Sequence, residues 1–334
     1  MATAAPYADA VADPHATELP PQLLPGVIPG REPTIILNRV SKWYGDIVAV
    51  SDVSFGVAPG VTALLGPNGA GKSTALKIMT GLIAPSNGTV TILGNPARGT
   101  PNTYRKVGLV HEAEHIYPYL TGREFVRING ILQRLPNLEP AVERAIDLVE
   151  LTDAADRRVG GYSKGMRQRI KVAAALVHDP EVILMDEPLN GMDPAQRLQM
   201  IALMRELGKT KTVLVSSHIL AEVERFAENI VVIVNGKLAA AGDFRAIRDR
   251  IDAHDHAVRI TTSEPRYLAM ALIGHPTTRS VRIDPQGRVV VETDDVRGFY
   301  AALPVLAKRA RARLIEVAAA DESLTAVFAY LVEG

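Results

Sequence analysis

Short apolar runs alternate along most of the chain with longer segments in which apolar residues recur at helical spacing. The apolar runs predict strands, and they cover residues 34–37, 47–57, 61–65, 88–92, 107–110, 182–185, 212–216 and 230–234. The helical spacing predicts helices over residues 75–82, 123–135, 140–151, 170–177 and 198–207. Because strands and helices alternate, we expect an α/β fold with a parallel sheet.

The pattern changes after Asp249. Before that point, Asn235-Gly236 is a strong turn signal and predicts that residues 230–234 and 237–241 form a hairpin. After it, strands are predicted over residues 258–262, 279–283, 289–292 and 314–318, and helices near residues 265–273, 296–310 and 323–331. This order predicts a small α+β domain of ferredoxin-like type. His254 and His256, between the two parts, could bind a metal ion, but a solvated linker explains them more simply.

Composition narrows the class of function. The 334 residues suffice for two domains, and 47% of them are hydrophobic and 22% charged, as in ordinary globular proteins. The 37 Lys and Arg residues balance the 37 Asp and Glu residues, so no overall basic field favours nucleic acid or an anionic membrane. Because the chain has no cysteine, it forms no disulfide and no thiolate metal site. No apolar run approaches about 18 residues, so we expect no membrane span.

Residues 1–32 differ from the rest of the chain. They are rich in Ala and Pro and contain no Lys or Arg before Arg31. They lack the basic region and the apolar run of a signal peptide. We expect a disordered leader here.

Residues 66–74 match the phosphate-binding pattern G-x-x-x-x-G-K-[ST] in full, between a predicted strand and a predicted helix. The residues of this loop are Gly66, Pro67, Asn68, Gly69, Ala70, Gly71, Lys72, Ser73 and Thr74. The glycines let backbone N–H groups converge on phosphate oxygens, and the helix that starts near Lys72 adds its positive dipole end. Lys72 supplies a charge for the β and γ phosphates, and the Ser73 hydroxyl is placed to ligate Mg²⁺. A glycine-rich turn without function is the alternative, but it does not explain the Lys and Ser at the required positions.

Two carboxylates, Asp186 and Glu187, directly follow the strand predicted over residues 182–185. Carboxylates at the end of a buried strand are costly unless something uses them. Asp186 is placed to hold Mg²⁺ through water, and Glu187 to accept a proton from an attacking water. His218 ends the next predicted strand, at the edge where α/β sheets bind ligands. A surface loop and a structural histidine are the alternatives.

Residues 111–115, His-Glu-Ala-Glu-His, match the zinc-protease pattern H-E-x-x-H. That pattern binds zinc only on a helix, where both histidines lie on one face. Here it follows a predicted strand and is closed by Pro118, which disfavours a helix. We therefore expect no zinc protease.

Trp43 and Tyr44 lie just upstream of the phosphate loop. An aromatic ring at this place could stack on adenine. Packing within the fold is the simpler alternative.

Together these motifs resemble those of the ATP-binding subunits of ATP-binding cassette (ABC) transporters, over about residues 34–243. The resemblance implies a P-loop NTPase core sheet with an antiparallel β subdomain and a helical subdomain. It makes residues 66–74 and 182–187 the Walker A and Walker B segments, and it implies ATP hydrolysis with Mg²⁺. The ABC ATP-binding domain then covers residues 33–245, and a C-terminal accessory or regulatory domain covers residues 250–334.

The resemblance also implies roles for single residues. By position, Tyr44 is similar to the adenine-stacking residue, Glu187 to the general base and His218 to the switch histidine near the γ-phosphate. The loop of residues 190–193, which ends at Asp193, would cross a dimer interface.

Ser163-Lys164-Gly165-Met166 stands where the family's signature Leu-Ser-Gly-Gly-Gln usually lies, with the Ser and the second Gly retained. A Ser hydroxyl and backbone N–H groups at a helix N-terminus form an anion site. In this family the site closes over ATP bound to the other subunit, which implies a head-to-tail dimer around two ATP molecules. Lys164 and Met166 resemble the variant of bacterial subunits that pair with separately encoded membrane partners of export type.

Glu112 stands where many relatives have Gln, whose side chain reaches Mg²⁺ and the attacking water. A carboxylate also accepts from water or ligates Mg²⁺, and it adds negative charge beside the γ-phosphate. Residues 115–124 would face the transmembrane partner.

We therefore expect a bacterial ATPase subunit at the cytoplasmic face of the membrane. It would energise solute export through separate transmembrane subunits by ATP-driven closure of a dimer of cassettes, with a second copy of this chain as the expected partner and no nucleic acid. The alternatives are a soluble ABC ATPase acting on nucleic acid or ribosomes, and a slow nucleotide-sensing interaction protein. The single cassette, without a heptad insertion between Lys72 and Asp186, speaks against the first alternative. The ending, residues 321–328, resembles the C-terminal extension of drug and antibiotic exporter ATPases.

Overall fold

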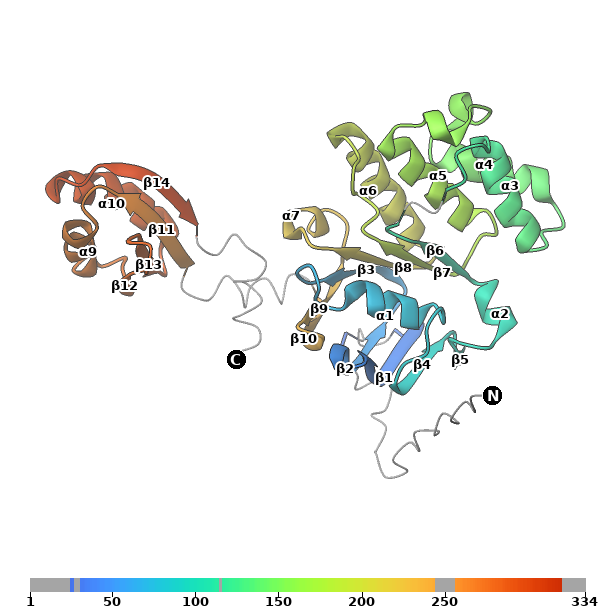
Figure 1. Cartoon of the computed structure of the whole chain (residues 1–334), viewed down its shortest axis with the longest axis horizontal. Coiled ribbons are helices and arrows are strands. Elements are labelled where there is room, and N and C mark those ends of the chain that lie inside the picture. The colour runs from blue at the N-terminus through green and yellow to red at the C-terminus, as the bar shows by residue number, and fades with distance from the viewer. Residues whose placement is uncertain (1–24, 27–30, 114–115, 244–255, 320–334) are drawn as a thin grey trace, which may run out of the picture. The chain divides into compact units, whose positions relative to one another are not determined.

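The computed structural model describes residues 25–26, 31–113, 116–243 and 256–319. Its contacts divide the chain into two compact units, Met1–Phe244 and Arg245–Gly334, and each is described by itself (Figure 1). Most of the expected leader, the linker histidine His254 and the helix expected over residues 323–331 lie outside the described residues.

The core of the first unit is a six-stranded sheet in the order β10-β9-β3-β8-β7-β6. Its strands are β3 (Gly60–Leu65), β6 (Val107–Val110), β7 (Val182–Asp186), β8 (Thr212–Ser217), β9 (Asn229–Val234) and β10 (Lys237–Asp243). All neighbours pair in parallel except β10, which forms the predicted hairpin with β9. Every residue of β3, β7 and β8 is buried, because parallel strands are covered on both faces.

An antiparallel sheet in the order β2-β1-β4-β5 forms a second layer. Its strands are β1 (Ile35–Tyr44), β2 (Ile47–Val57), β4 (Asn87–Ile92) and β5 (Asn95–Pro96). Helix α1 (Lys72–Met79) packs between the two sheets, where Leu76 and Ile78 share one hydrophobic cluster with Phe55 of β2 and Leu64 of β3 (Figure 1). This cluster fixes the phosphate loop at the start of α1.

Three helices form a separate group in the first unit: α3 (Gly122–Leu132), α4 (Leu138–Leu148) and α5 (Lys164–Leu176) (Figure 1). Thr121 and Glu124 form a capping box at the start of α3, as the Thr-x-x-Glu spacing favours. The expected antiparallel and helical subdomains are thus confirmed. The other helices in the described part of this unit are α2 (Pro101–Tyr104), α6 (Pro194–Gly208), α7 (Leu220–Val223) and the 3₁₀ turns Thr152–Ala154 and Val159–Gly161.

The described residues of the second unit form one antiparallel sheet in the order β12-β13-β11-β14, with two helices. Its elements are β11 (His256–Thr262), α9 (Pro265–Ile273), β12 (Ser280–Ile283), β13 (Val289–Thr293), α10 (Val296–Arg309) and β14 (Leu314–Ala319). The helices pack on the sheet around Phe299, which is fully buried. The β-α-β-β-α-β order is the ferredoxin-like arrangement, so this prediction is confirmed.

The structure differs from the predicted elements at two places near the site. β1 continues to Tyr44, although its apolar pattern ends at Leu37, because it pairs with β2 and β4 through register shifts that accommodate polar residues. Trp43 and Tyr44 are therefore strand residues. Helix α6 begins at Pro194 rather than near Leu198, because the Asp193 side chain caps its N-terminus by accepting from Gln196 N at 2.9 Å.

Candidate functional site

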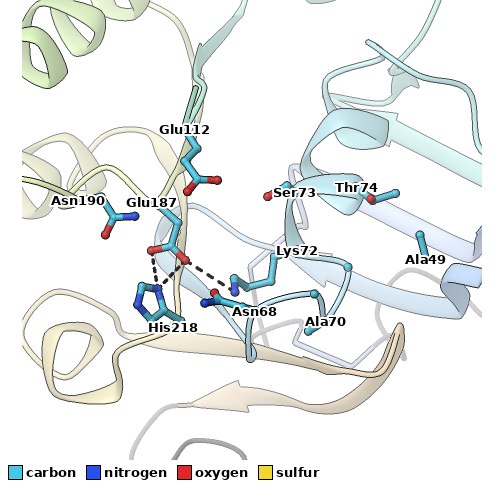
Figure 2. Close-up of a pocket in the computed structure, with 12 residues that line it drawn as sticks. Ala49, Asn68, Ala70, Lys72, Ser73, Thr74, Glu112, Glu187, Asn190 and His218 are labelled. Atoms are coloured by element: carbon cyan, nitrogen blue, oxygen red, sulfur yellow. Dashed lines mark hydrogen bonds and ion pairs between the residues drawn. The ribbon is translucent and has the colours of Figure 1, made fainter. Parts of the chain in front are cut away.

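Four loops meet at the carboxyl edge of the core sheet. β3 leads into the phosphate loop, β6 into Glu112, β7 into Glu187 and β8 into His218. Because these strands are parallel, their carboxyl ends lie at one edge. The loops enclose a cavity of about 440 Å³ (Figure 2). It is lined by Ala49, Asn68, Gly69, Ala70, Gly71, Lys72, Ser73, Thr74, Glu112, Glu187, Asn190 and His218.

Glycine is required at both ends of the phosphate loop. A Cβ on Gly66 would lie 2.2 Å from the carbonyl oxygen of Ile233, and one on Gly71 would lie 2.4 Å from that of Ala49. Gly71 also has a φ of 104°, in the left-handed region, and precedes the first turn of α1. That region is open to glycine at little cost. The free N–H groups of the first turn of α1 therefore adjoin the cavity.

The Lys72 ammonium is buried, with the residue 6% exposed. Its Nζ donates to the carbonyl oxygens of Gly66 at 2.7 Å and Pro67 at 3.2 Å, and it lies 3.7 Å from Oε1 of Glu187. Burial lowers the pKa of Lys72, while the nearby carboxylates of Glu187 and Asp186 oppose that shift. A buried cation at the mouth of a backbone N–H cluster suits a polyphosphate.

Glu187 is 9% exposed, and both of its carboxylate oxygens lie 3.0 Å from Nδ1 of His218 (Figure 2). Its φ of 48° is in the left-handed region, which non-glycine residues seldom adopt outside functional sites and turns. Burial raises the pKa of the Glu187 carboxyl, and the contact with His218 opposes that shift. A carboxylate with a raised pKa is the stronger base.

Ser216 fixes both acidic residues at the end of β7. Its Oγ donates to Oδ1 of Asp186 at 2.7 Å and accepts from the backbone N–H of Glu187 at 2.8 Å. Asp186 is 2% exposed and does not line the cavity. Sequence reasoning missed Ser216, although a hydroxyl at the end of an apolar strand beside His218 was an available signal.

Glu112 extends from the loop after β6 toward the side of the cavity where the Ser73 hydroxyl lies (Figure 2). Residues 111–113 form a bend and not a helix, as predicted. His111 Nδ1 accepts from the backbone N–H of Ala113 at 3.0 Å, a contact within the loop. His115, the second histidine of the zinc-protease pattern, lies outside the described residues. Among the residues that are described, no group of three or more His, Cys, Asp or Glu side chains could hold a metal ion by itself.

Several predicted site residues lie away from this cavity. Tyr44 is half exposed at the end of β1, with Lys42 Nζ 5.1 Å from its ring centroid. Ser163 caps α5 by accepting from Met166 N at 3.2 Å. The site residues predicted from the sequence that do not line the cavity are Tyr44, Gly66, Pro67, Ser163, Lys164, Gly165, Met166, Asp186 and Asp193.

Residues 163–166, the signature segment, pack against the start of α6. A Cβ on Gly165 would lie 1.9 Å from Oε1 of Gln196, in the first turn of α6, and one on Gly191 would lie 2.3 Å from the side chain of Lys164. The N-termini of α5 and α6 thus form one surface with the Asn190 loop, and Ser163 and Lys164 are exposed on it.

Comparison with known proteins agrees with this geometry. Residues 50–190 match the ABC transporter family model. The chain is 35% identical over 217 residues to the uncharacterized ABC transporter ATP-binding protein YxlF of Bacillus subtilis (strain 168), covering 64% of this chain and 72% of that protein. It is 33% identical over 256 residues to Nod factor export ATP-binding protein I of Rhizobium meliloti (strain 1021), covering 74% of this chain and 76% of that protein.

Solved structures show the same fold. An ATP-binding subunit of an ABC transporter superposes with a TM-score of 0.59 at 30% identity, covering 65% of this chain and 92% of that one. A dimeric post-hydrolysis state of the ATP-binding cassette MJ0796, bound to ADP and Pi, superposes with a TM-score of 0.58 at 26% identity, covering 63% of this chain and 99% of that one. The chain belongs to the ATP-binding proteins of ABC transporters and is an ATPase of that family. Within the described part of the chain, no helix has the length and apolar character needed to cross a membrane.

Proposed function

We propose that this chain energises solute export through separately encoded transmembrane subunits, by closing a dimer of cassettes around two ATP molecules. The convergence of Lys72, Ser73, Glu187 and His218 on one cavity supports this proposal most directly. These four side chains supply a cation, a hydroxyl ligand, a base and a group that orients the base.

The side chains and backbone groups that line the cavity are of the kinds that MgATP would require. The phosphate loop and Lys72 would hold the β and γ phosphates, and the exposed ring of Tyr44 would stack on the adenine. Ser73 and Glu112 present a hydroxyl and a carboxylate to the same side of the cavity, which are oxygen ligands of the kind that Mg²⁺ accepts beside substrate phosphates. Asp186 would hold the ion through water. Bound Mg²⁺ neutralises phosphate charge.

Glu187 would accept the proton of the attacking water. Its burial favours that transfer by raising the carboxyl pKa, and the contact with His218 Nδ1 fixes the direction of the carboxylate. His218 would also reach the γ-phosphate, because its ring lines the same cavity.

A second copy of this chain would complete each site. Ser163, Lys164, Gly165 and Met166 lie at the start of α5, away from the cavity of their own chain. In a head-to-tail dimer they would cover the γ-phosphate bound by the partner, and Asp193 would lie in the loop that crosses the interface. A solved dimeric cassette with ADP and Pi supports this arrangement.

The transmembrane partner would bind beside α3, at the cytoplasmic face of a bacterial membrane. Tyr117 and Tyr119 are 56% and 65% exposed there. A cavity of about 300 Å³ lies between β6, α3 and α5 and includes Phe125, Asn129 and Lys171 in its lining. A relative named for Nod factor export supports export as the direction of transport.

The C-terminal domain, residues 250–334, would regulate or stabilise the dimer, as an accessory to the ATP-binding domain of residues 33–245. The second unit has its own hydrophobic core, as an accessory domain requires. Truncation after Asp249 tests this role. We expect weaker dimerisation or altered ATPase rate, and unchanged dimerisation, turnover and transport would contradict it.

Purification from bacterial membranes tests the function of the whole chain. Tagged full-length chain expressed in its own host should copurify with a membrane protein, and ATP should turn over in that complex. Retained nucleic acid would instead favour a soluble ATPase acting on nucleic acid or ribosomes, and very slow turnover would favour a nucleotide sensor.

A further inference from the structure

Lys171 is a charged residue within a buried, otherwise apolar stretch of α5. The residues that surround it in sequence, from Ile170 to Leu176, are otherwise apolar and buried, and Lys171 itself is 7% exposed. A buried lysine is uncommon unless its ammonium has polar partners. Sequence reasoning assigned no role to this residue.

The ammonium group finds its partners in the loop that carries Glu112. Lys171 Nζ donates to the carbonyl oxygens of His111 at 2.7 Å, Glu112 at 3.2 Å and Ala113 at 3.4 Å. An ammonium has three donors and no acceptor, so one lysine can serve three successive carbonyls. These carbonyls directly follow Val110, the last residue of β6. Lys171 therefore ties this loop to α5.

Residues 111–113 lie outside the helices and strands. Within these three residues, the backbone N–H of Ala113 donates to His111 Nδ1 at 3.0 Å. The Glu112 side chain lines the nucleotide cavity on the side where the Ser73 hydroxyl lies. Its carboxylate stays in that place only while the backbone of the loop is held.

We propose that Lys171 is a positioning residue: it clamps the loop of residues 111–113 to α5 and thereby sets the place of the Glu112 carboxylate in the nucleotide cavity. The inference rests on the proposed function of that cavity. Helix α5 begins at the signature segment, about two turns before Lys171. The clamp thus connects the segment proposed to meet the partner's ATP with a residue of the chain's own site.

Replacing Lys171 with Met tests the clamp, because Met has similar reach without charge or donors. Lys211→Met is the matched control. Lys211 is also largely buried, and its Nζ donates to Asp179 Oδ1 at 2.7 Å and to the Pro180 carbonyl at 2.8 Å. It precedes β8, at the edge of the sheet opposite the cavity. Lys171→Gln, which keeps an amide donor, carries the test if the Met variant does not fold.

Hydrogen exchange of the full-length chain measures how firmly Lys171 holds residues 111–113, and it does not depend on ATP hydrolysis. In Lys171→Met, amides of residues 111–113 should exchange about tenfold or more faster, because the loop opens more often. Lys211→Met should leave them unchanged. Equal exchange in parent and Lys171→Met would overturn the clamp.

Steady-state ATPase kinetics measure its consequence. Lys171→Met should lower kcat about ten- to a hundredfold through misplacement of Glu112, with little change in KM for ATP, because the phosphate loop is untouched. Lys171→Arg, which keeps charge and donors, should restore most of the rate. A loss confined to KM, or one that Arg does not rescue, would overturn the positioning role.

A double-mutant cycle separates positioning from general destabilisation. In a Glu112→Ala background, Lys171→Met should cost less than about twofold in kcat, because its effect passes through the carboxylate already removed. An equal loss in both backgrounds would show that Lys171 acts elsewhere and overturn the proposal. If the parent chain does not hydrolyse ATP at all, the proposed function fails, while the exchange experiment still decides the clamp.

Discussion

The two units of this chain pack helices on apolar sheets in similar ways, yet they bury different polar groups. At the carboxyl edge of the first unit's core sheet, Lys72, Asp186, Glu187 and Ser216 are all at most 9% exposed. Among the described residues of the second unit, the polar residues buried as a whole are Thr262 and Thr293, and the Asp284 carboxylate is paired at 2.7 Å with Arg288, which lies four residues further along the chain.

The difference follows from sheet topology. Parallel strands deliver the loops after β3, β6, β7 and β8 to one edge, so charged groups distant in sequence converge on one cavity. The second sheet is antiparallel throughout, so strands that are neighbours in the sheet end at opposite edges. Burying charge is costly, and the first unit retains buried charges at the edge of the sheet where its cavity lies.

The largest expected effect is on turnover by the first unit. Glu187→Gln should lower kcat by about 10²- to 10⁴-fold, the range for loss of a general base, while ATP still binds. Glu181→Gln is the control, since Glu181 is an exposed carboxylate at the opposite end of β7, paired with Lys106. Steady-state phosphate release measures both variants. A rate for Glu187→Gln equal to that of the control would remove Glu187 from the base's role.

A substitution that creates a cavity in the core of the second unit should lower the stability of that unit alone. Phe299→Ala removes a fully buried ring from the core of the second unit and should destabilise it by about 3–5 kcal/mol. Hydrogen exchange should rise across α10 and stay unchanged across α1. Phe55→Ala is the matched change in the first unit. Loss of protection in α1 on Phe299→Ala would contradict two separate cores.

ATP affinity should depend on Lys72 by a smaller amount. Lys72→Ala removes a charged donor to phosphate, worth about 1.5–3 kcal/mol, so the Kd for ATP should rise about ten- to a hundredfold. Lys77→Ala, in the last turn of the same helix, is the control. Calorimetric titration with ATP measures both. Equal affinity in the Lys72 variant and the parent would refute the phosphate role of the loop.

The smallest expected effect is a gradual dependence of kcat/KM on pH. Burial raises the pKa of Glu187, so this carboxyl takes up a proton at a higher pH than an ordinary glutamic acid. As pH falls through that raised pKa, kcat/KM should fall about tenfold per pH unit, because only the carboxylate accepts a proton. The pH profile of the parent should show this acid limb above the usual carboxyl range. An acid limb that persists unchanged in Glu187→Gln would assign it to another group.

The sequence predicted the parts of this site that depend on local chemistry. A short apolar strand precedes the phosphate loop, the pair Asp186 and Glu187, and His218. The end of such a strand can be located from the local sequence pattern alone. The ferredoxin-like order of the second unit also followed from the alternation of strands and helices. These elements lie where the pattern indicated.

What the sequence did not indicate depends on contacts between distant segments. Lys171 and His111 are 60 residues apart, and Ser216 and Asp186 are 30 residues apart, so no local pattern joins them. The extension of β1 to Tyr44 depends on register shifts in its pairing with two neighbours. Tertiary pairing can keep polar residues in a strand even where the local pattern argues against one.

In the proposed mechanism, ATP closes two copies of this chain around each other, with the signature segment of one copy covering the nucleotide of the other. The most direct test is the solution mass of Glu187→Gln, which should retain MgATP, measured by light scattering with and without MgATP. We predict a monomer without nucleotide and a dimer with MgATP, and Ser163→Arg, which blocks the proposed contact, should keep the ATP-bound chain monomeric. A mass that does not change on addition of saturating MgATP would contradict closure of a dimer of this chain.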